Sequence, residues 1–274
     1  MSGISLTPTD ERALTPPLNG SLIQSRRARR SAAEASIAYE RALAPELSKE
    51  ETLIDGVVPR SRSDSFNRGL NVVLAATGLL VTLPLLFLIG VFIKLTSRGP
   101  ILYAQTRVGL DRRWRRTLAM HDRRVRDLGG AVFTIYKFRT MRVDAEAKSG
   151  AVWAKENDPR VTPLGKYLRI LRLDELPQLW NILRGDMNIV GPRPERPSIV
   201  ARLQRDITHY GSRHRVRPGL TGLAQINQQY DACLDDVRTK VSYDLDYLRT
   251  QSLLLDMQIM LRTVPAVLLK YRGW

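Results

Sequence analysis

The sequence has few cysteine, histidine and aromatic residues, on which disulfides, many metal sites and many nucleic-acid-binding surfaces depend. Cys233 is the only cysteine in 274 residues, so no disulfide forms within the chain, and a lone thiol is compatible with a reducing compartment. The three histidines show no metal-ligand spacing with one another or with Cys233, so we expect no site built from them. Aromatic residues make up 7% of the chain, and they form no run interleaved with basic residues of the kind that binds nucleic acid.

Acidic side chains are scarce relative to basic ones. The chain has 43 lysines and arginines against 27 acids, a net charge of +16, which favours anionic partners such as phospholipid, a phosphorylated substrate or nucleic acid. Residues 1–67 carry nine basic and nine acidic side chains, whereas the segment from Lys94 to Arg142 carries thirteen against three. The basic surface is therefore expected in that segment.

Only one uncharged apolar run has membrane length, so the chain is not predicted to cross a membrane many times. It extends from Asn71 to Ile93, which is 23 residues or roughly 34 Å as a helix. Pro84 near its middle removes a backbone hydrogen bond and should kink the helix. Basic residues flank both ends, and because positive charge marks the cytoplasmic side, a re-entrant helix-break-helix fits better than a spanning helix. The spanning helix remains the alternative.

The stretch from Arg169 to Glu195 contains the strongest candidate site, centred on the adjacent acids Asp174 and Glu175. Because a proline is tolerated in the first turn of a helix, Pro177 predicts a helix that begins at this pair, with Asp174 as its N-cap. Gly185 is the predicted end of that helix. The predicted apolar stripe consists of Leu176, Leu179, Trp180 and Leu183. The acid pair is thereby placed at a helix N-terminus, the end that attracts anions.

Arginines stand on both sides of the acid pair. Arg169 and Arg172 precede it in a helix predicted to begin at Thr162, and Arg193 follows it in a Pro-rich turn. Two acids among arginines at a helix N-terminus predict a site for a metal-bound phosphate. The competing interpretation is an acid pair that merely caps a surface helix.

Two strands are predicted, from Ile101 to Val108 and from Ala131 to Phe138. Alternation places Lys137 and Arg139 on one face of the second strand, where they could hold neighbouring phosphate oxygens; a solvated basic edge strand is the alternative. The segment between the strands, Gly109 to Gly130, has seven arginines and three acids. It suits contact with anionic lipid headgroups, although a nucleic-acid arm would look similar.

Two later segments leave their roles open. Arg217 to Gly222 either approaches a nucleotide closely or forms a structural turn. Helices are predicted from Pro197 to His209 and again after Asp231. The last residues, Val264 to Trp274, suit the headgroup layer of a membrane, or packing against the core or a second subunit.

Five motifs in order give the chain a resemblance to a known family. They are Lys137-Phe138-Arg139-Thr140-Met141, Asp174-Glu175-Leu176-Pro177-Gln178-Leu179, Gly185-Asp186-Met187, Val190-Gly191-Pro192-Arg193-Pro194 and Arg217-Pro218-Gly219-Leu220-Thr221-Gly222. Together they resemble the signature of the bacterial sugar transferases, the monotopic polyprenyl-phosphate hexose-1-phosphate transferases. The resemblance covers roughly residues 66–274.

The resemblance implies an α+β fold, mostly α, in a monotopic protein of the bacterial inner membrane. We expect a flexible N-terminal extension without a signal peptide over residues 1–62, and a re-entrant helix-break-helix anchor kinked at Pro84 over residues 63–98. A cytosolic helical catalytic core with a small β-hairpin is expected over 99–230, followed by C-terminal amphipathic helices over 231–274.

The resemblance also implies a reaction and its partners. A sugar-1-phosphate would pass from a UDP-sugar to polyprenyl (undecaprenyl) phosphate, releasing UMP and starting the assembly of an exopolysaccharide, O-antigen or other glycan. Asp174 would be the nucleophile that forms a covalent intermediate, and Glu175 would bind Mg2+. The implied phosphate ligands are Lys137, Arg139, Arg169 and Arg193, with Asp186 ordering Arg193 or the metal shell. Membrane phospholipid is the other expected partner, a homodimer is left open, and nucleic acid is not expected.

Three features depart from the family pattern. Relatives commonly have serine directly before the anchor proline, where this chain has Leu83, and Thr82 is the nearest hydroxyl that could satisfy the kinked backbone. The basic loop 109–130 is longer than usual, and relatives often have serine or threonine at Arg172. Two other functions remain open: a non-catalytic basic scaffold on the membrane, and a nucleic-acid binder that uses the loop.

Overall fold

The structure is a computed structural model that describes residues 57–112, 129–143, 145, 158–228 and 233–267. All of these residues belong to one compact unit, Arg41–Trp274. The predictions for residues 1–56, for most of the basic loop and for residues 268–274 lie outside the described residues.

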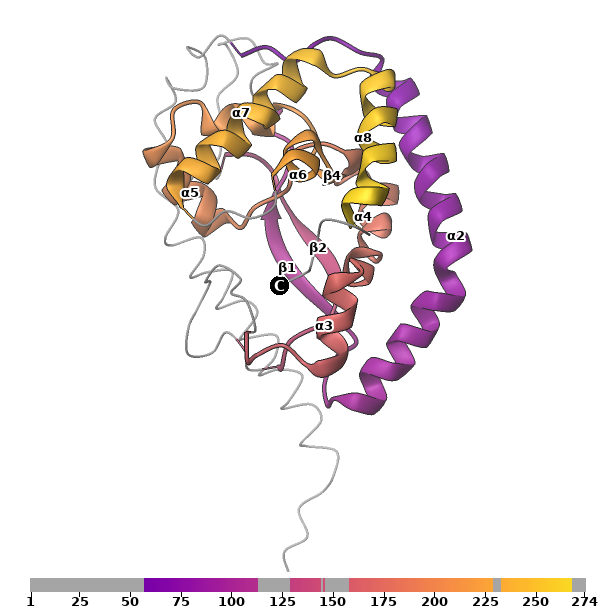
Figure 1. Ribbon diagram of the computed structural model, residues 1–274. Helices are drawn as coiled ribbons and strands as arrows, with labels where there is room; N and C mark the ends of the chain where they lie inside the picture. Colours follow the sequence, from indigo (N-terminus) through magenta and orange to yellow (C-terminus); the bar gives the residue numbers. More distant parts are fainter. Residues whose placement is uncertain (1–56, 113–128, 144, 146–157, 229–232, 268–274) are drawn as a thin grey trace, which may run out of the picture. The chain divides into compact units, whose positions relative to one another are not determined.

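The apolar run forms a single helix, α2 (Asp64–Thr96), which begins where the Ser63 hydroxyl accepts a hydrogen bond from the N–H of Phe66. Pro84 lies inside this helix without interrupting it. The Thr82 hydroxyl donates to the carbonyl of Gly78 at 2.6 Å, and not to that of Leu80, the carbonyl that lacks an N–H because of the proline. The helix is bowed in Figure 1, with α3, α4 and the hairpin on its concave side. The re-entrant break itself stays a prediction.

One side of α2 packs on the unit and the other is exposed. Ala75 and Ile93 are buried, and a side chain at Gly78 would touch Leu179. Phe87 on the other side is 75% exposed, and several leucines and valines of the same helix are exposed to a similar degree. Within the part of the chain that the structure describes, α2 is the one helix long and apolar enough to cross a membrane.

Both ends of α2 are fixed to the same unit. Near its start, Arg68 donates to two carbonyls at the end of α4 (Gln178–Arg184), and the Asn71 Oδ1 accepts from the N–H of Ile189 at 2.6 Å. At its end, Arg139 donates to the carbonyl of Ser97 at 2.8 Å. The helix therefore follows the surface of the unit along its length.

The predicted strands form an antiparallel hairpin of β1 (Leu102–Val108) and β2 (Val132–Phe138). In this register Tyr103 lies opposite Lys137, and Arg107 lies opposite Phe133. A second, parallel pair consists of β3 (Asn188–Val190) and β4 (Gly219–Thr221).

The glycines of the two Pro-Gly motifs hold β3 and β4 together. A Cβ on Gly219 would lie 2.1 Å from the backbone nitrogen of Gly191, and one on Gly222 would lie 2.3 Å from the Gly191 carbonyl oxygen. Contacts this short leave no room for any side chain. These glycines therefore have a packing role between β3 and β4, and the approach of residues 217–222 to a nucleotide stays a prediction.

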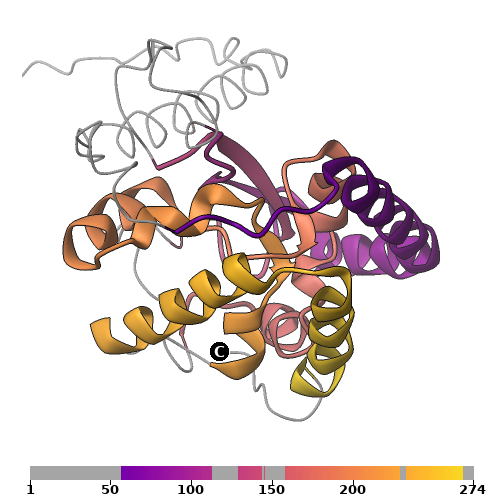
Figure 2. The same cartoon turned by 90° about the horizontal axis from the view of Figure 1, so that it is seen from above.

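The remaining elements are mostly helical. They are α3 (Pro163–Ile170), the 3-10 turn η2 (Leu173–Glu175), α5 (Pro197–Asp206), the 3-10 helix η3 (Tyr210–Arg215), α6 (Leu223–Asn227), α7 (Leu234–Thr250) and α8 (Leu253–Pro265). Figure 2 shows α2 and α5 on opposite sides of the unit. The mostly helical fold with a small hairpin is confirmed.

The largest apolar core joins regions that we predicted as separate. It includes residues of α5, α7 and α8 together with Val108 and Val190, so the C-terminal helices share one core with the catalytic region. Val57, predicted to belong to the flexible extension, is 2% exposed in this core. Arg62 forms an ion pair with Asp256 of α8 at 2.7 Å. The packed region thus begins by residue 57.

Candidate active site

The local backbone of the acid pair differs from the prediction. Arg172 adopts a left-handed conformation with φ of 55°, which ends α3 and turns the chain into η2. Asp174 is therefore not an N-cap, and α4 begins only after Pro177. The prediction failed because a left-handed residue and i→i+3 hydrogen bonds leave no periodic signal in the sequence. Gly185 does end the helix, with φ of 90°, as predicted.

The buried face of α4 also differs from the predicted stripe. Trp180 is 52% exposed, whereas the polar Asn181 is fully buried. The Asn181 amide donates to the carbonyl of Thr134 at 2.7 Å and accepts from the N–H of Tyr136 at 3.1 Å, so it pairs with the backbone of β2. The side-chain amide of Asn181 thus joins α4, for which the sequence predicted an apolar buried face, to the strand that carries Lys137.

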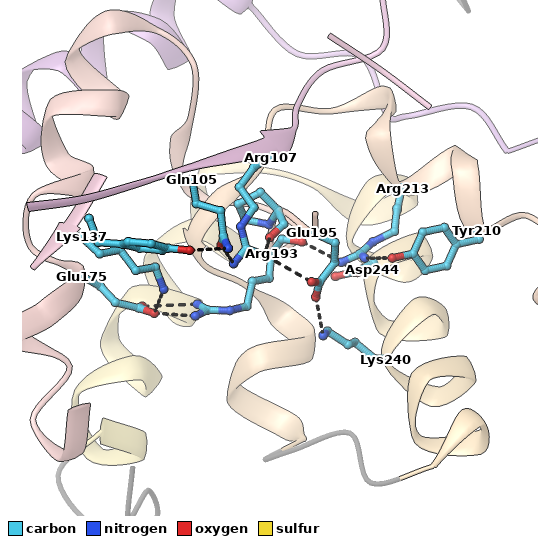
Figure 3. Close-up of polar contacts among 12 residues, drawn as sticks. Gln105, Arg107, Lys137, Glu175, Arg193, Glu195, Tyr210, Arg213, Lys240 and Asp244 are labelled. Carbon is cyan, nitrogen blue, oxygen red and sulfur yellow. Dashed lines mark hydrogen bonds and ion pairs between the residues drawn. The ribbon is translucent and has the colours of Figure 1, made fainter. Parts of the chain in front are cut away.

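Glu175 is surrounded by cations (Figure 3). Its carboxylate accepts from Lys137 Nζ at 2.7 Å and from both terminal nitrogens of Arg193, one of them at 3.3 Å, and Arg172 lies 3.8 Å away. Burial opposes ionisation, but Arg193 and Lys137 hold the pKa of Glu175 well below its usual value. Glu175 is therefore ionised, and the neighbouring cations balance its negative charge.

Asp174 has a different environment although it is adjacent and equally buried. Among the described residues, no hydrogen bond or ion pair reaches its carboxylate. Burial and the charge of Glu175 raise the pKa of Asp174, while Lys137 and Arg169 partly oppose this. The oxygen lone pairs of such a carboxylate are available to attack an electrophile, so Asp174 is suited to act as a nucleophile.

The structure places Arg169 and Arg172 at the pair. The Nε of Arg169 donates to the Thr140 hydroxyl at 2.9 Å, which fixes its guanidinium near Asp174, and both arginines lower the pKa of that acid. Lys137 and Arg193 also lie at the acid pair, so three of the four predicted cationic phosphate ligands meet there, together with Arg172.

Two other predicted ligands have different partners. The strand ends at Phe138, so the alternation that placed Arg139 beside Lys137 does not continue, and Arg139 instead binds the carbonyls at the end of α2. Asp186 accepts from Asn181 at 3.2 Å and pairs with Arg184 at 3.5 Å rather than with Arg193.

Sequence reasoning missed the residues that hold the turn around Arg193 (Figure 3). Arg107 of β1 donates to the carbonyl of Pro194 at 3.0 Å and pairs with Glu195, which also pairs with Lys240 of α7 at 3.2 Å. Burial opposes the ionisation of Glu195, yet Lys240 and Arg107 lower its pKa to about 2. These residues come from elements far apart in the chain, so no local spacing could have found them.

A buried arginine holds the same turn from the other side. Arg213 donates to the carbonyl of Arg193 at 3.0 Å and to the Tyr210 hydroxyl at 2.9 Å, and it forms an ion pair with Asp244 of α7 at 2.6 Å. The two charged side chains are 1% and 2% exposed.

The acids offer a limited donor set for a metal. Among the described residues, no group of three or more His, Cys, Asp or Glu side chains could hold an ion. Oε2 of Glu175 accepts only one hydrogen bond, at 3.3 Å, so it keeps a lone pair for a hard cation. Mg2+ typically takes one or two carboxylates together with substrate phosphates and water, and the residues present fit that pattern.

Comparison with known proteins identifies relatives that match most of the described region. The profile of the bacterial sugar transferase family matches residues 62–270. The chain is 41% identical over 215 residues to a UDP-glucose:undecaprenyl-phosphate glucose-1-phosphate transferase of Caulobacter vibrioides, covering 78% of this chain and 73% of the relative. It is 38% identical over 218 residues to a UDP-N-acetylgalactosamine-undecaprenyl-phosphate N-acetylgalactosaminephosphotransferase of Aeromonas hydrophila, covering 80% and 47%.

A third relative is similar in length to the matched region. It is an exopolysaccharide production protein of Rhizobium leguminosarum, 34% identical over 212 residues, with 76% of this chain and 97% of the relative covered. The chain thus spans about half of the Aeromonas relative but nearly all of the Rhizobium one.

Proposed function

The chain belongs to the bacterial sugar transferase family, and from this premise we propose that it transfers a sugar-1-phosphate from a UDP-sugar to undecaprenyl phosphate. The products are undecaprenyl-diphosphate-sugar and UMP, and the step starts the assembly of an exopolysaccharide or related glycan. The observation that carries the proposal is the division of roles at the acid pair: Glu175 is neutralised by cations, and Asp174 is left unpaired among the described residues.

In the first step Asp174 attacks the β-phosphorus of the UDP-sugar. A bond forms between the aspartate oxygen and phosphorus, and the bond from phosphorus to the bridging oxygen breaks, so that UMP leaves with that oxygen. The raised pKa of Asp174 makes its ionised carboxylate a better nucleophile than an exposed aspartate. The enzyme then carries the sugar phosphate as an acyl phosphate.

In the second step an oxygen of undecaprenyl phosphate attacks the same phosphorus, and the aspartate oxygen leaves as a carboxylate. The two anionic substrates thus never need to react directly with each other. Lys137, Arg169, Arg172 and Arg193 supply positive charge around the transferred phosphoryl group, because charge held in place in a buried site stabilises the transition state.

Glu175 would hold Mg2+ as a cofactor, because one of its carboxylate oxygens keeps a lone pair for a hard cation. When bound, it would neutralise charge on the leaving UMP and on the transferred group. Lys137 and Arg193, which contact Glu175, would supply positive charge to the phosphate oxygens beside the ion.

We also propose that α2 anchors the protein to the inner membrane from the cytosolic side without spanning it. Because both ends of α2 are bound to the same unit, by Asn71 at one end and Arg139 at the other, a spanning orientation would pull one of these contacts into the bilayer. A helix that lies on or dips into the membrane keeps both contacts and buries its exposed apolar side in lipid.

Relatives at 41% and 38% identity are named for glucose and N-acetylgalactosamine, so the test uses several sugars. It measures UMP release by purified protein with Mg2+, undecaprenyl phosphate and a panel of UDP-sugars. Release with one sugar that Asp174→Asn abolishes supports the proposal, and a phosphosugar adduct on Asp174, detected by mass spectrometry, supports the covalent step. Folded protein that is inactive across the panel would contradict it.

A further inference from the structure

The turn that carries Arg193 is held by a buried ion pair that costs free energy to form. Arg213 and Asp244 are both almost fully buried, and the Arg213 guanidinium lies 5.2 Å over the ring of Tyr210. Taking two charges out of water is expensive, and replacing such a pair by apolar residues is often neutral or stabilising. Stability alone is therefore a poor reason for this pair to lie in the core.

The contacts of Arg213 indicate another reason. One terminal nitrogen donates to the backbone carbonyl of Arg193, and the other donates to the Tyr210 hydroxyl, while Asp244 of α7 pairs with the guanidinium. The planar guanidinium thus fixes the direction of three groups at once. Arg193 in turn contacts both oxygens of Glu175.

We propose that Arg213 and Asp244 are positioning residues that set the place of Arg193 relative to the acid pair, and so join α7 to the active site. This inference rests on the proposed function. Neither residue touches substrate: Arg213 acts through the Arg193 backbone, and Asp244 acts through Arg213. A displacement of Arg193 by about 1 Å would be enough to lower the rate up to a hundredfold.

The decisive experiment removes the pair without leaving a buried charge. In the double variant Arg213→Met/Asp244→Leu, the core keeps apolar side chains of similar total volume, so we expect a folded protein. Its melting temperature should fall by a few degrees at most, because the Tyr210 hydroxyl and the Arg193 carbonyl each lose one hydrogen bond. The kcat/KM for UMP release should nevertheless fall at least about tenfold. A stable double variant with wild-type kcat/KM would overturn the proposal, because a merely structural pair would be fully replaced.

A matched control and a second variant complete the test. Arg238→Met/Asp235→Leu removes the same charges from an exposed pair on α7 and should change neither stability nor rate. If the buried double variant does not fold, Arg213→Lys keeps the charge beside Asp244 but cannot reach all three partners. It should fold and lose activity, and full activity in it would overturn the proposal.

A readout without turnover separates this inference from the proposed function. Because Arg213 donates to the backbone carbonyl of Arg193, its loss should loosen the turn, and hydrogen–deuterium exchange of peptides spanning residues 190–196 should become faster than in the wild type and in the exposed-pair control. Unchanged exchange in the buried double variant contradicts the positioning role. Wild-type protein that releases no UMP contradicts only the proposed function.

Discussion

The two adjacent acids should respond to the same chemical change in opposite directions. Glu175→Gln and Asp174→Asn each remove one charge while keeping the shape of the side chain. Glu175 pairs with Lys137 and Arg193, whereas no described residue bonds to the carboxylate of Asp174. We therefore expect Glu175→Gln to destabilise the protein and Asp174→Asn to stabilise it, although both abolish UMP release.

The magnitude for Glu175 follows from its partners. Removing one member of a buried ion pair costs about 3–5 kcal/mol, because the other charge stays buried without a partner. Lys137 and Arg193 remain 18% and 26% exposed, so water solvates them in part and the lower value of about 3 kcal/mol applies. For a domain of this size that corresponds to a fall in melting temperature of about 6–12 °C.

The sign for Asp174 follows from its pKa. A carboxyl whose folded-state pKa lies above its unfolded value weakens the folded state as pH rises through that interval, so at neutral pH its charge is destabilising. The depressed pKa of Glu175 has the opposite effect: its contribution is present at neutral pH and is lost as pH falls through the folded-state value. An asparagine at position 174 should therefore raise the melting temperature.

Thermal unfolding of the three proteins in detergent at neutral pH checks this. Asp235→Asn, a change at an acid whose side chain is 82% exposed on α7, is the control and should leave the melting temperature unchanged. Equal destabilisation by both active-site changes, or none by Glu175→Gln, would refute the reasoning.

Further predictions concern the fold, pH and the metal. Gly219→Ala should destabilise by at least about 2 kcal/mol in chemical unfolding, because its Cβ would lie 2.1 Å from the Gly191 nitrogen; an unchanged transition would contradict this. Asn181→Ala should cost about 1–3 kcal/mol and lower kcat, since it leaves backbone groups of β2 unpaired beside Lys137; wild-type rate and stability would argue against that role. The rate should fall on acidification with a midpoint above pH 3.8, because protonation removes the attacking form of Asp174; a pH–rate profile flat to pH 4 would contradict it. EDTA should abolish UMP release and excess Mg2+ should restore it, whereas release that persists in EDTA would exclude a metal requirement.

Features that depend on local pattern could be predicted from the amino-acid sequence. The apolar length of the run from Asn71 to Ile93, the β-branched and aromatic strands, and Gly185 at the end of α4 each follow from forces within a few residues of chain. The motifs around Asp174 and Arg193 likewise identified the family that the comparisons show. These signals are strong because each motif is short and continuous.

Which charged side chains meet depends on the three-dimensional fold. The sequence could not show that Arg139 binds the end of α2 instead of the site, or that Glu195 and Arg213 hold the turn of Arg193, because these contacts join elements distant in the chain. Apart from the family resemblance, nothing in the local pattern distinguishes Asp174 from Glu175, because the two acids are adjacent in the same motif. In the part of the chain that the structure describes, the placement of the cations leaves Glu175 paired and Asp174 without a hydrogen bond or ion pair.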